Sequence, residues 1–474
     1  MFNLYYLDYI VICLFLFTIG SISYSTRLKR NTIVQFLVAG RKLTLPLYTA
    51  SFISCWYGGI LGIGEAIQQY GIGAFALFLF PYYFFTAIYA LFLAKKVRQK
   101  EQISIPERLA KKFDKKAGLI GSIIVYFLSL PAPQILMFAI LVQMLTSLPL
   151  WICLIVTSVV SAALVNKGGM LTDAKVSMVG SFLVIIGFLA MFYKCLTLSS
   201  PMEVLKSLPE SHGSLLGGHD LLGYASYFIL GLWILASPHY HQKACSAIDE
   251  VTSQRGMLLA LIATVMIDSM VMYIGLYAIH QIPFEGNNPI AQLPLAANYL
   301  LPSGFKAIFI CGLMTAILSD IVGNLLINGT TIGSTVIRYF RPISEGQQLE
   351  NSRFFVIISA VLATIIILII PSVTGLWYIW AGSFVGALLL PTLISYTPLS
   401  SYFSSKAVNS SLIFSLLVST SWTIYCLITQ NDFVFAGLKI GTVVPGLGVS
   451  GLILGPSFLG NNLDFLCRTK VENN

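Results

Sequence analysis

Long apolar segments constrain this chain more than any other feature of its sequence. About 20 apolar residues span the hydrocarbon core of a membrane as a helix. Hydrophobic residues make up 57% of the 474 residues and charged residues only 10%, whereas a soluble domain has about 25% charged residues. Thirteen apolar segments follow one another, near residues 6–26, 46–73, 74–95, 117–146, 148–166, 177–196, 221–242, 257–281, 306–334, 353–371, 375–396, 409–428 and 435–460. We therefore expect an all-α polytopic membrane protein with about thirteen transmembrane helices, in contact with membrane lipids.

The distribution of basic residues predicts the orientation of these helices. Cytoplasmic loops carry an excess of Lys and Arg, and every second connection here is basic, beginning with Arg27, Lys29 and Arg30 after the first segment. The opposite connections carry few cations, at residues 194, 206 and 306. We expect a multi-pass protein of the cell membrane with its N-terminus outside and its C-terminus in the cytoplasm. The net charge of +9 then follows from membrane topology, and no nucleic-acid partner is expected.

Residues 46–74 are long enough to span a membrane but are unsuited to one regular helix. Gly58 and Gly59 are adjacent near the middle, and each glycine weakens a helix by roughly 1 kcal/mol. Unwound backbone at membrane depth is tolerated only inside protein or beside a water-filled cavity. We expect a broken helix whose freed carbonyls and helix ends bind a ligand. The alternative is a glycine-lined helix packed closely on its neighbours.

Three carboxylates lie at membrane depth, at Glu65, Asp268 and Asp320. A charge at the bilayer centre costs at least about 2.5–3.5 kcal/mol, so each is a candidate functional residue. Asp320 follows Ser319, and the carbonyl of Ala316 lies one helical turn earlier. These three oxygen donors are the kind that hard cations prefer. A structural role remains the alternative for each carboxylate.

Several motifs resemble the sodium:solute symporter family, and they are spread in order along most of the chain. Ala39-Gly40-Arg41-Lys42-Leu43 resembles the family's entry to its second helix, and Ser104-Ile105-Pro106-Glu107 is similar to a cytoplasmic family loop. Gly168-Gly169 and Gln242-Lys243 stand where the family has related pairs. The resemblance implies a LeuT-type fold with two inverted five-helix repeats and broken helices 2 and 7. Gly231 and Pro238 suit the second break.

The resemblance also implies the division of the chain, which is a single transporter domain over residues 1–474. Helix 1 covers residues 6–26, the first repeat 46–196, the second repeat 221–396, and helices 12 and 13 cover 409–460. The function implied is secondary active transport by alternating access. The chain is then not an enzyme, has no cofactor other than a coupling sodium ion, and is expected to function as a monomer.

The family's shared sodium site falls on named residues of this chain. The resemblance implies carbonyl ligands at Ser54 and Tyr57, and ligands in helix 9 at Ala316, Ser319 and Asp320. The family usually has Ser or Thr where this chain has Asp320. An aspartate could hold sodium more tightly, or it could take up a proton instead, so proton-coupled symport through Asp320 is the alternative.

A second sodium site of some family members is not expected here. Its aspartate matches Ser177, and its hydroxyl residues match Val322 and Gly323. Asp173 could replace Ser177 only with a gap of four residues. The sequence therefore predicts one coupling ion.

The substrate is expected to be a small zwitterionic or cationic nitrogenous solute, either amino-acid-like or a quaternary ammonium. Residues 56–59 and 375–378 resemble the choline-transporter branch, and aromatic faces attract quaternary ammonium, whereas Pro238-His239 resembles the proline and pantothenate branch. The expected substrate-binding residues are Trp56, Gly58, Gly59, Trp233, Ile234 and Ser237.

Two other classes of function compete with transport. A membrane enzyme would need a catalytic group beside His239 and His241, and ordinary polar residues at a helix end explain both histidines better. A transport-inactive membrane sensor is the remaining alternative.

Overall fold

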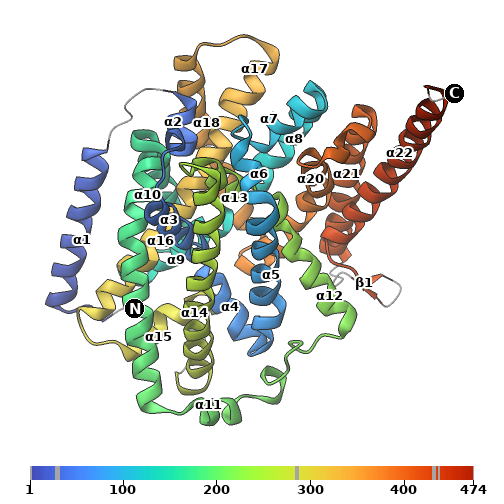
Figure 1. Ribbon diagram of the computed structural model, residues 1–474. Helices are drawn as coiled ribbons and strands as arrows, with labels where there is room; N and C mark the ends of the chain where they lie inside the picture. The colour runs from blue at the N-terminus through green and yellow to red at the C-terminus, as the bar shows by residue number, and fades with distance from the viewer. Residues whose placement is uncertain (1–2, 27–31, 283–287, 430–433, 436–437, 473–474) are drawn as a thin grey trace.

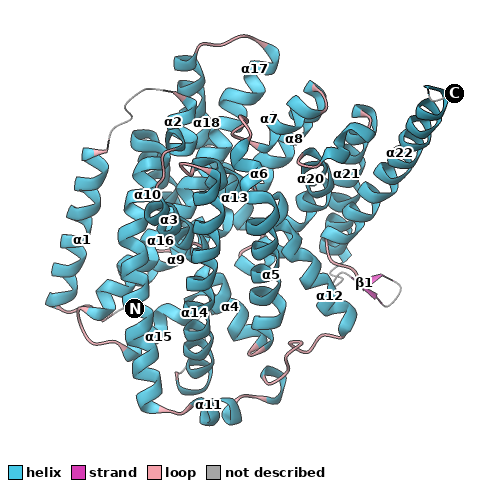
Figure 2. Cartoon of the chain, viewed as in Figure 1, coloured by secondary structure: helices cyan, strands magenta, loops and turns pink. Residues whose placement is uncertain are grey.

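The computed structural model describes residues 3–26, 32–282, 288–429, 434–435 and 438–472, so Arg27, Lys29 and Arg30 lie outside the described residues. Helices dominate these parts of the chain (Figure 2). The strands found there are β1 (Val434–Phe435) and β2 (Leu438–Lys439), which pair antiparallel. The all-α prediction is confirmed.

The first half of the chain forms helices and short 3-10 or π-helical segments, the latter marked η. They are α1 (Tyr6–Ser25), α2 (Ile33–Val38), η1 (Ala39–Arg41), α3 (Leu45–Tyr57), α4 (Ile60–Tyr70), η2 (Phe75–Leu79), α5 (Phe80–Ile88), η3 (Tyr89–Leu93), α6 (Ala94–Gln99), α7 (Ile105–Lys112), α8 (Lys115–Leu128), α9 (Ala132–Thr146), α10 (Leu150–Leu198), α11 (Pro201–Ser207) and η4 (Glu210–His212). Within α10 two helices meet at Gly169, whose φ of 58° is positive, so the break falls between the predicted segments 148–166 and 177–196.

The second half continues in the same manner. Its elements are α12 (Leu221–Leu230), η5 (Gly231–Ala236), α13 (Pro238–Ser246), α14 (Glu250–Gln281), η6 (Pro289–Ala291), α15 (Gln292–Leu300), α16 (Phe305–Thr330), η7 (Thr331–Val336), α17 (Ile337–Phe340), α18 (Glu345–Ile369), α19 (Val373–Gly375), η8 (Leu376–Ala381), α20 (Gly382–Ser395), η9 (Pro398–Tyr402), α21 (Ser405–Thr429) and α22 (Val443–Glu472). The last predicted segment, 435–460, therefore begins in the β-hairpin and becomes helical at Val443.

The number of transmembrane spans agrees with the prediction only in part. Among the described residues nine helices are long and apolar enough to cross a membrane, and the bent pair α3–α4 makes a tenth. Three shorter apolar helices, Tyr6–Ile22, Leu150–Val165 and Val443–Leu459, coincide with the remaining predicted segments. Thirteen spans therefore remains a prediction.

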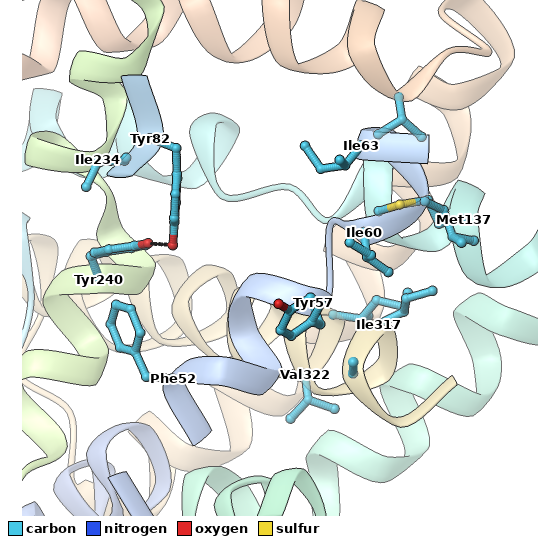
Figure 3. Close-up of a cluster of buried hydrophobic side chains, with 14 of the residues drawn as sticks. Phe52, Tyr57, Ile60, Ile63, Tyr82, Met137, Ile234, Tyr240, Ile317 and Val322 are labelled. Carbon is cyan, nitrogen blue, oxygen red and sulfur yellow. Dashed lines mark hydrogen bonds between the residues drawn. The ribbon is translucent and has the colours of Figure 1, made fainter. Parts of the chain in front are cut away.

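Both expected helix breaks are present. The axes of α3 and α4 differ by 42° across Gly58 and Gly59, and Figure 3 shows the ribbon bending between Tyr57 and Ile60. The second break lies between α12 and α13, where η5 ends at an extended Ser237. Ser237 then caps α13 by accepting a hydrogen bond from the Tyr240 backbone N–H. Pro238 suits the first position of that helix, where no backbone donor is needed.

α16 lies at the centre of the bundle. In the span that begins with α16, 89% of the most apolar stretch is buried, whereas in α21 only 28% is buried. α21 lies with α22 near one edge of the bundle (Figure 1). α16 packs on α3, α9, α10 and α18 and also contacts α1, which stands at the edge opposite α21 and α22 (Figure 1). Small residues allow close helix approach in membranes; a Cβ at Gly312 would lie 2.6 Å from the Val184 backbone nitrogen in α10. The centre of the bundle thus brings α16 against the α3–α4 break.

Candidate functional site

The α3–α4 break packs directly on α16 at Asp320. A methyl group added to Gly58 would lie 2.3 Å from Asp320 Cβ, which is closer than any real contact. A methyl group at Gly62, one turn into α4, would lie 2.5 Å from the Trp377 ring. The glycines therefore let α16 and η8 approach the unwound backbone. The structure brings together the two segments that were expected to form an ion site.

The backbone of the break leaves one predicted ligand available. The Ser54 carbonyl accepts a hydrogen bond from the Gly58 N–H at 3.0 Å, and the Trp56 carbonyl accepts one from Gly59 at 3.0 Å. No backbone N–H of the described residues bonds to the Tyr57 carbonyl across the break. The Ser54 hydroxyl is buried and has no hydrogen-bond partner there. Buried polar groups are nearly always satisfied, so this region has free capacity for a bound cation.

Ser319 and Asp320 are adjacent in α16 but make contacts with different elements. The Ser319 hydroxyl lies 2.7 Å from the Ser177 hydroxyl of α10. Asp320 instead accepts a hydrogen bond from Gln134 Nε2 of α9 at 2.7 Å and lies 2.8 Å from His239 Nδ1 of α13. Ala316, one turn earlier, is fully buried in α16. In this conformation Asp320 contacts the cavity residues rather than Ser319.

A cavity of about 180 Å³ lies beside the break, and we call it the central cavity. Four of the six tryptophans of the chain line it, together with Tyr82, Tyr240 and Phe78. Of the predicted substrate residues, those that line the cavity are Trp56, Gly59, Trp233 and Ser237. Gly58 instead packs on Asp320, and Ile234 is buried beside Tyr82 and Tyr240 (Figure 3).

Asp268 of α14 holds Trp56 in place. Its carboxylate accepts hydrogen bonds from Trp56 Nε1 at 2.9 Å, Tyr57 OH at 3.1 Å and Tyr83 OH at 2.8 Å. The Trp56 ring also stacks on Tyr82. A buried carboxylate with three donors is a satisfied structural group, and here it orients an aromatic wall of the central cavity.

Glu65 has a structural role as well. Its carboxylate accepts hydrogen bonds from the backbone N–H groups of Val373 and Thr374 at 3.0 and 3.1 Å, and from the Ser372 hydroxyl at 2.6 Å. Free N–H groups at a helix start favour a carboxylate. Glu65 therefore joins α4 to the beginning of α19.

Several cavity residues were missed from the sequence. The apolar segment 117–146 was expected to be one helix, but it divides into α8 and α9 at residues 129–131. Ser129 and Leu130 of this break, and Gln134 after it, line the central cavity. Pro131 was the available signal, because proline disrupts a helix interior. Trp377 lies in the stretch 375–378 that resembles the choline-transporter branch, although it was not named as a substrate residue, whereas Asn324 and Trp380 carried no local signal.

Residues considered for a second cation site have other contacts. Asp173 forms a buried ion pair with Lys243, whose ammonium also donates to the Ser51 hydroxyl at 2.6 Å. Gly323 lies against the His239 ring, since a Cβ there would be 2.5 Å from His239 Nε2. A single coupling ion remains a prediction.

The sequence of the chain matches that of a known protein family. The model of the sodium:solute symporter family matches residues 36–417. No curated protein sequence matches the chain significantly. Among solved structures, a substrate-bound, outward-open Na+-coupled sialic acid symporter is similar, with a TM-score of 0.74 and 13% identity, over 94% of this chain and 98% of that one.

Two further structures share the fold. A nucleobase-cation-symport-1 family transporter, closed with bromovinylhydantoin bound, has a TM-score of 0.59 and 15% identity, with 90% of this chain and 94% of that chain covered. A mutant form of the Eremococcus coleocola manganese transporter has a TM-score of 0.51 and 13% identity, with 89% and 94% covered. At these identities the similarity establishes the LeuT-type fold alone.

Proposed function

The chain belongs to the sodium:solute symporter family, and from this premise we propose that it couples an inward sodium gradient to uptake of a small cationic or zwitterionic nitrogenous solute. Family and fold make it a multi-pass membrane protein and a secondary active symporter rather than an enzyme. We further propose that it works as a monomer, with its N-terminus outside the cell and its C-terminus in the cytoplasm.

The contact between Gly58 and Asp320 is the observation that carries the sodium proposal. This contact brings the part of α16 that contains Ser319 close to the Tyr57 carbonyl and to the Ser54 hydroxyl, which has no hydrogen-bond partner among the described residues. We propose that sodium binds between them, with ligands from the carbonyls of Ser54, Tyr57 and Ala316 and from Ser319. Oxygen donors of this kind suit a hard cation. To bind the ion, the Ser319 hydroxyl must turn away from Ser177, to which it is hydrogen-bonded in this conformation. The neighbouring Asp320 contributes negative charge.

The composition of the central cavity supports a nitrogenous cation or zwitterion as solute. Trp56, Trp233, Trp377 and Trp380 present aromatic rings there. A desolvated cation over such a ring gains about 2 kcal/mol. Asp320 supplies a carboxylate, and no Lys or Arg is among the described residues that line the cavity. An anionic solute would have no cationic partner in it.

One observation favours proton coupling as a second candidate. The Asp320 carboxylate and the His239 imidazole are 2.8 Å apart, and both line the central cavity. Paired carboxylates and histidines at membrane depth are typical of proton relays. In this scheme Asp320 takes up a proton on the outer side of the transport cycle and releases it through His239 on the inner side.

Uptake into proteoliposomes tests both schemes. Purified protein is reconstituted, and accumulation of pooled labelled cationic and zwitterionic solutes is measured under an inward sodium gradient, an inward proton gradient, or neither. Sodium coupling predicts accumulation with the sodium gradient alone, and Asp320→Asn then weakens the sodium dependence without abolishing it. Proton coupling predicts accumulation with the proton gradient and its loss in Asp320→Asn. Solute binding without accumulation under any gradient would overturn symport and favour a sensor.

A further inference from the structure

Three metal-ligating side chains converge on one wall of the central cavity. Cys55 comes from α3, His239 from α13 and Asp320 from α16. All three are buried, and their ligand atoms lie within 4.8 Å of one another. Cys55 is 184 positions before His239 and 265 positions before Asp320, and the three meet because α3, α13 and α16 pack on one another at this point. Sodium coupling uses neither the thiol nor the imidazole.

The three side chains are close enough to share one tetrahedral transition-metal ion after side-chain rotation. Zinc binds sulfur at about 2.3 Å and nitrogen at about 2.0–2.1 Å, so a tetrahedral ion holds its sulfur and nitrogen ligands about 3.5 Å apart. Cys55 Sγ lies 3.6 Å from His239 Nδ1, 3.7 Å from His239 Nε2 and 3.9 Å from Asp320 Oδ1. Because Sγ is nearly equidistant from the two ring nitrogens, an ion at Nδ1 can reach the sulfur only if the imidazole or the thiol rotates. Nδ1 and Oδ1 are 2.8 Å apart and would separate by about half an ångström around an ion.

The surroundings orient two of the ligands and bring an unpartnered amide oxygen close to them. Gly323 admits the His239 ring against α16, which turns Nδ1 toward Asp320. Gln134 donates from Nε2 to the other Asp320 oxygen, whereas its buried Oε1 has no hydrogen-bond partner among the described residues. A hydrogen bond to the other oxygen of a ligating carboxylate orients that carboxylate toward the ion. The unpartnered oxygen belongs to the same amide that bonds to Asp320, so it is available as a further donor near the site.

We propose that the central cavity binds a borderline divalent transition-metal ion of the zinc class through Cys55 Sγ, His239 Nδ1 and the Asp320 carboxylate. The fourth position faces the cavity and is taken by water or Gln134 Oε1. Binding displaces the thiol proton, which leaves to solvent, and uses a neutral imidazole. Thiolate and imidazole select zinc-class ions over sodium, magnesium and calcium. Because the ion occupies Asp320, it excludes the coupled solute from the cavity.

Cobalt titration of the purified protein tests the site directly. Co2+ bound to a thiolate gives a charge-transfer absorption band, and Zn2+ removes the band by displacement. The wild type is expected to bind one Co2+ per chain with this band. Zinc-finger peptides bind zinc with about 10–16 kcal/mol from four ligands, so loss of one ligand is expected to weaken binding about 100-fold or more. Cys55→Ser therefore abolishes the band, and His239→Gln weakens binding.

Cys245→Ser is the matched control. Cys245 Sγ lies 3.7 Å from His241 Nδ1, and no carboxylate of the described residues completes this buried Cys–His pair as a group of three ligands. This variant is expected to keep the band at full intensity. A wild-type protein without the band, a band that persists in Cys55→Ser, or its loss in Cys245→Ser would each overturn the proposal, provided that each variant elutes as a monodisperse protein. The assay needs no transport, so failure of the symport proposal leaves this result unchanged.

Discussion

Gly58→Ala adds one methyl group at the point where the α3–α4 break meets α16. Gly58 has φ −59° and ψ −23°, a conformation that alanine adopts without strain. The effect therefore comes from the contact with Asp320 Cβ at 2.3 Å, where ordinary contacts begin at 3.4 Å. To remove this clash, the break and α16 must move apart by about 1 Å. Binding sites tolerate displacements of only about 0.5 Å in the positions of their ligands. Overpacking of this kind costs about 1–3 kcal/mol, which is about 5- to 150-fold in affinity if it opposes ion binding.

The assay is the sodium-induced rise in unfolding temperature of the purified protein. A ligand that binds only the folded state raises this temperature with concentration, so the sodium concentration needed for half the rise reports affinity. Gly448→Ala in α22 is the control, because no atom of the described residues lies within 4 Å of the added methyl group. We expect Gly58→Ala to need more sodium and Gly448→Ala to behave as the wild type. A Gly58→Ala protein with unchanged sodium dependence would refute the placement of the ion at the break.

Three further changes test the surrounding contacts. Glu65→Ala leaves the start of α19 without its acceptor and should lower the free energy of unfolding by about 1.5–3 kcal/mol. Glu65→Gln keeps an acceptor oxygen and should lower it less. A Glu65→Ala protein as stable to thermal unfolding as the wild type would contradict the capping role. Asp268→Ala leaves three buried donors without an acceptor and should lower the free energy of unfolding more than Tyr83→Phe, which removes one of these donors. The reverse order would contradict the role of Asp268 in orienting Trp56. Trp233→Ala should weaken inhibition of uptake by tetramethylammonium about 30-fold, since the ring contributes about 2 kcal/mol, whereas Trp233→Phe should lose less; unchanged inhibition in both would place the solute elsewhere.

The helix breaks were accessible from the sequence because their causes are local. Adjacent glycines at Gly58 and Gly59, and Pro238 after Gly231, disfavour a regular helix whatever surrounds them. Both breaks are present in the structure. The contact of the first break with α16 was implied by family resemblance rather than by any local pattern.

The direction of each polar side chain could not be derived in the same way. Asp320 was expected to point with Ser319 toward one ion, but it contacts His239 and Gln134, which lie 81 and 186 positions earlier in the chain. His239 was interpreted as a residue of a helix end, yet the second break turns it into the central cavity. Such contacts depend on helix rotation and packing, which apolar segments of nearly uniform hydrophobicity do not specify.

Equilibrium binding of radioactive sodium to the purified protein tests the central claim most directly. Wild-type protein and the Ser319→Ala and Ser177→Ala variants are compared at matched purity. We predict one sodium ion per wild-type chain, retained in Ser177→Ala and lost or greatly weakened in Ser319→Ala. No bound sodium in the wild type, or the same binding in Ser319→Ala as in the wild type, would contradict a coupling-ion site between the α3–α4 break and α16.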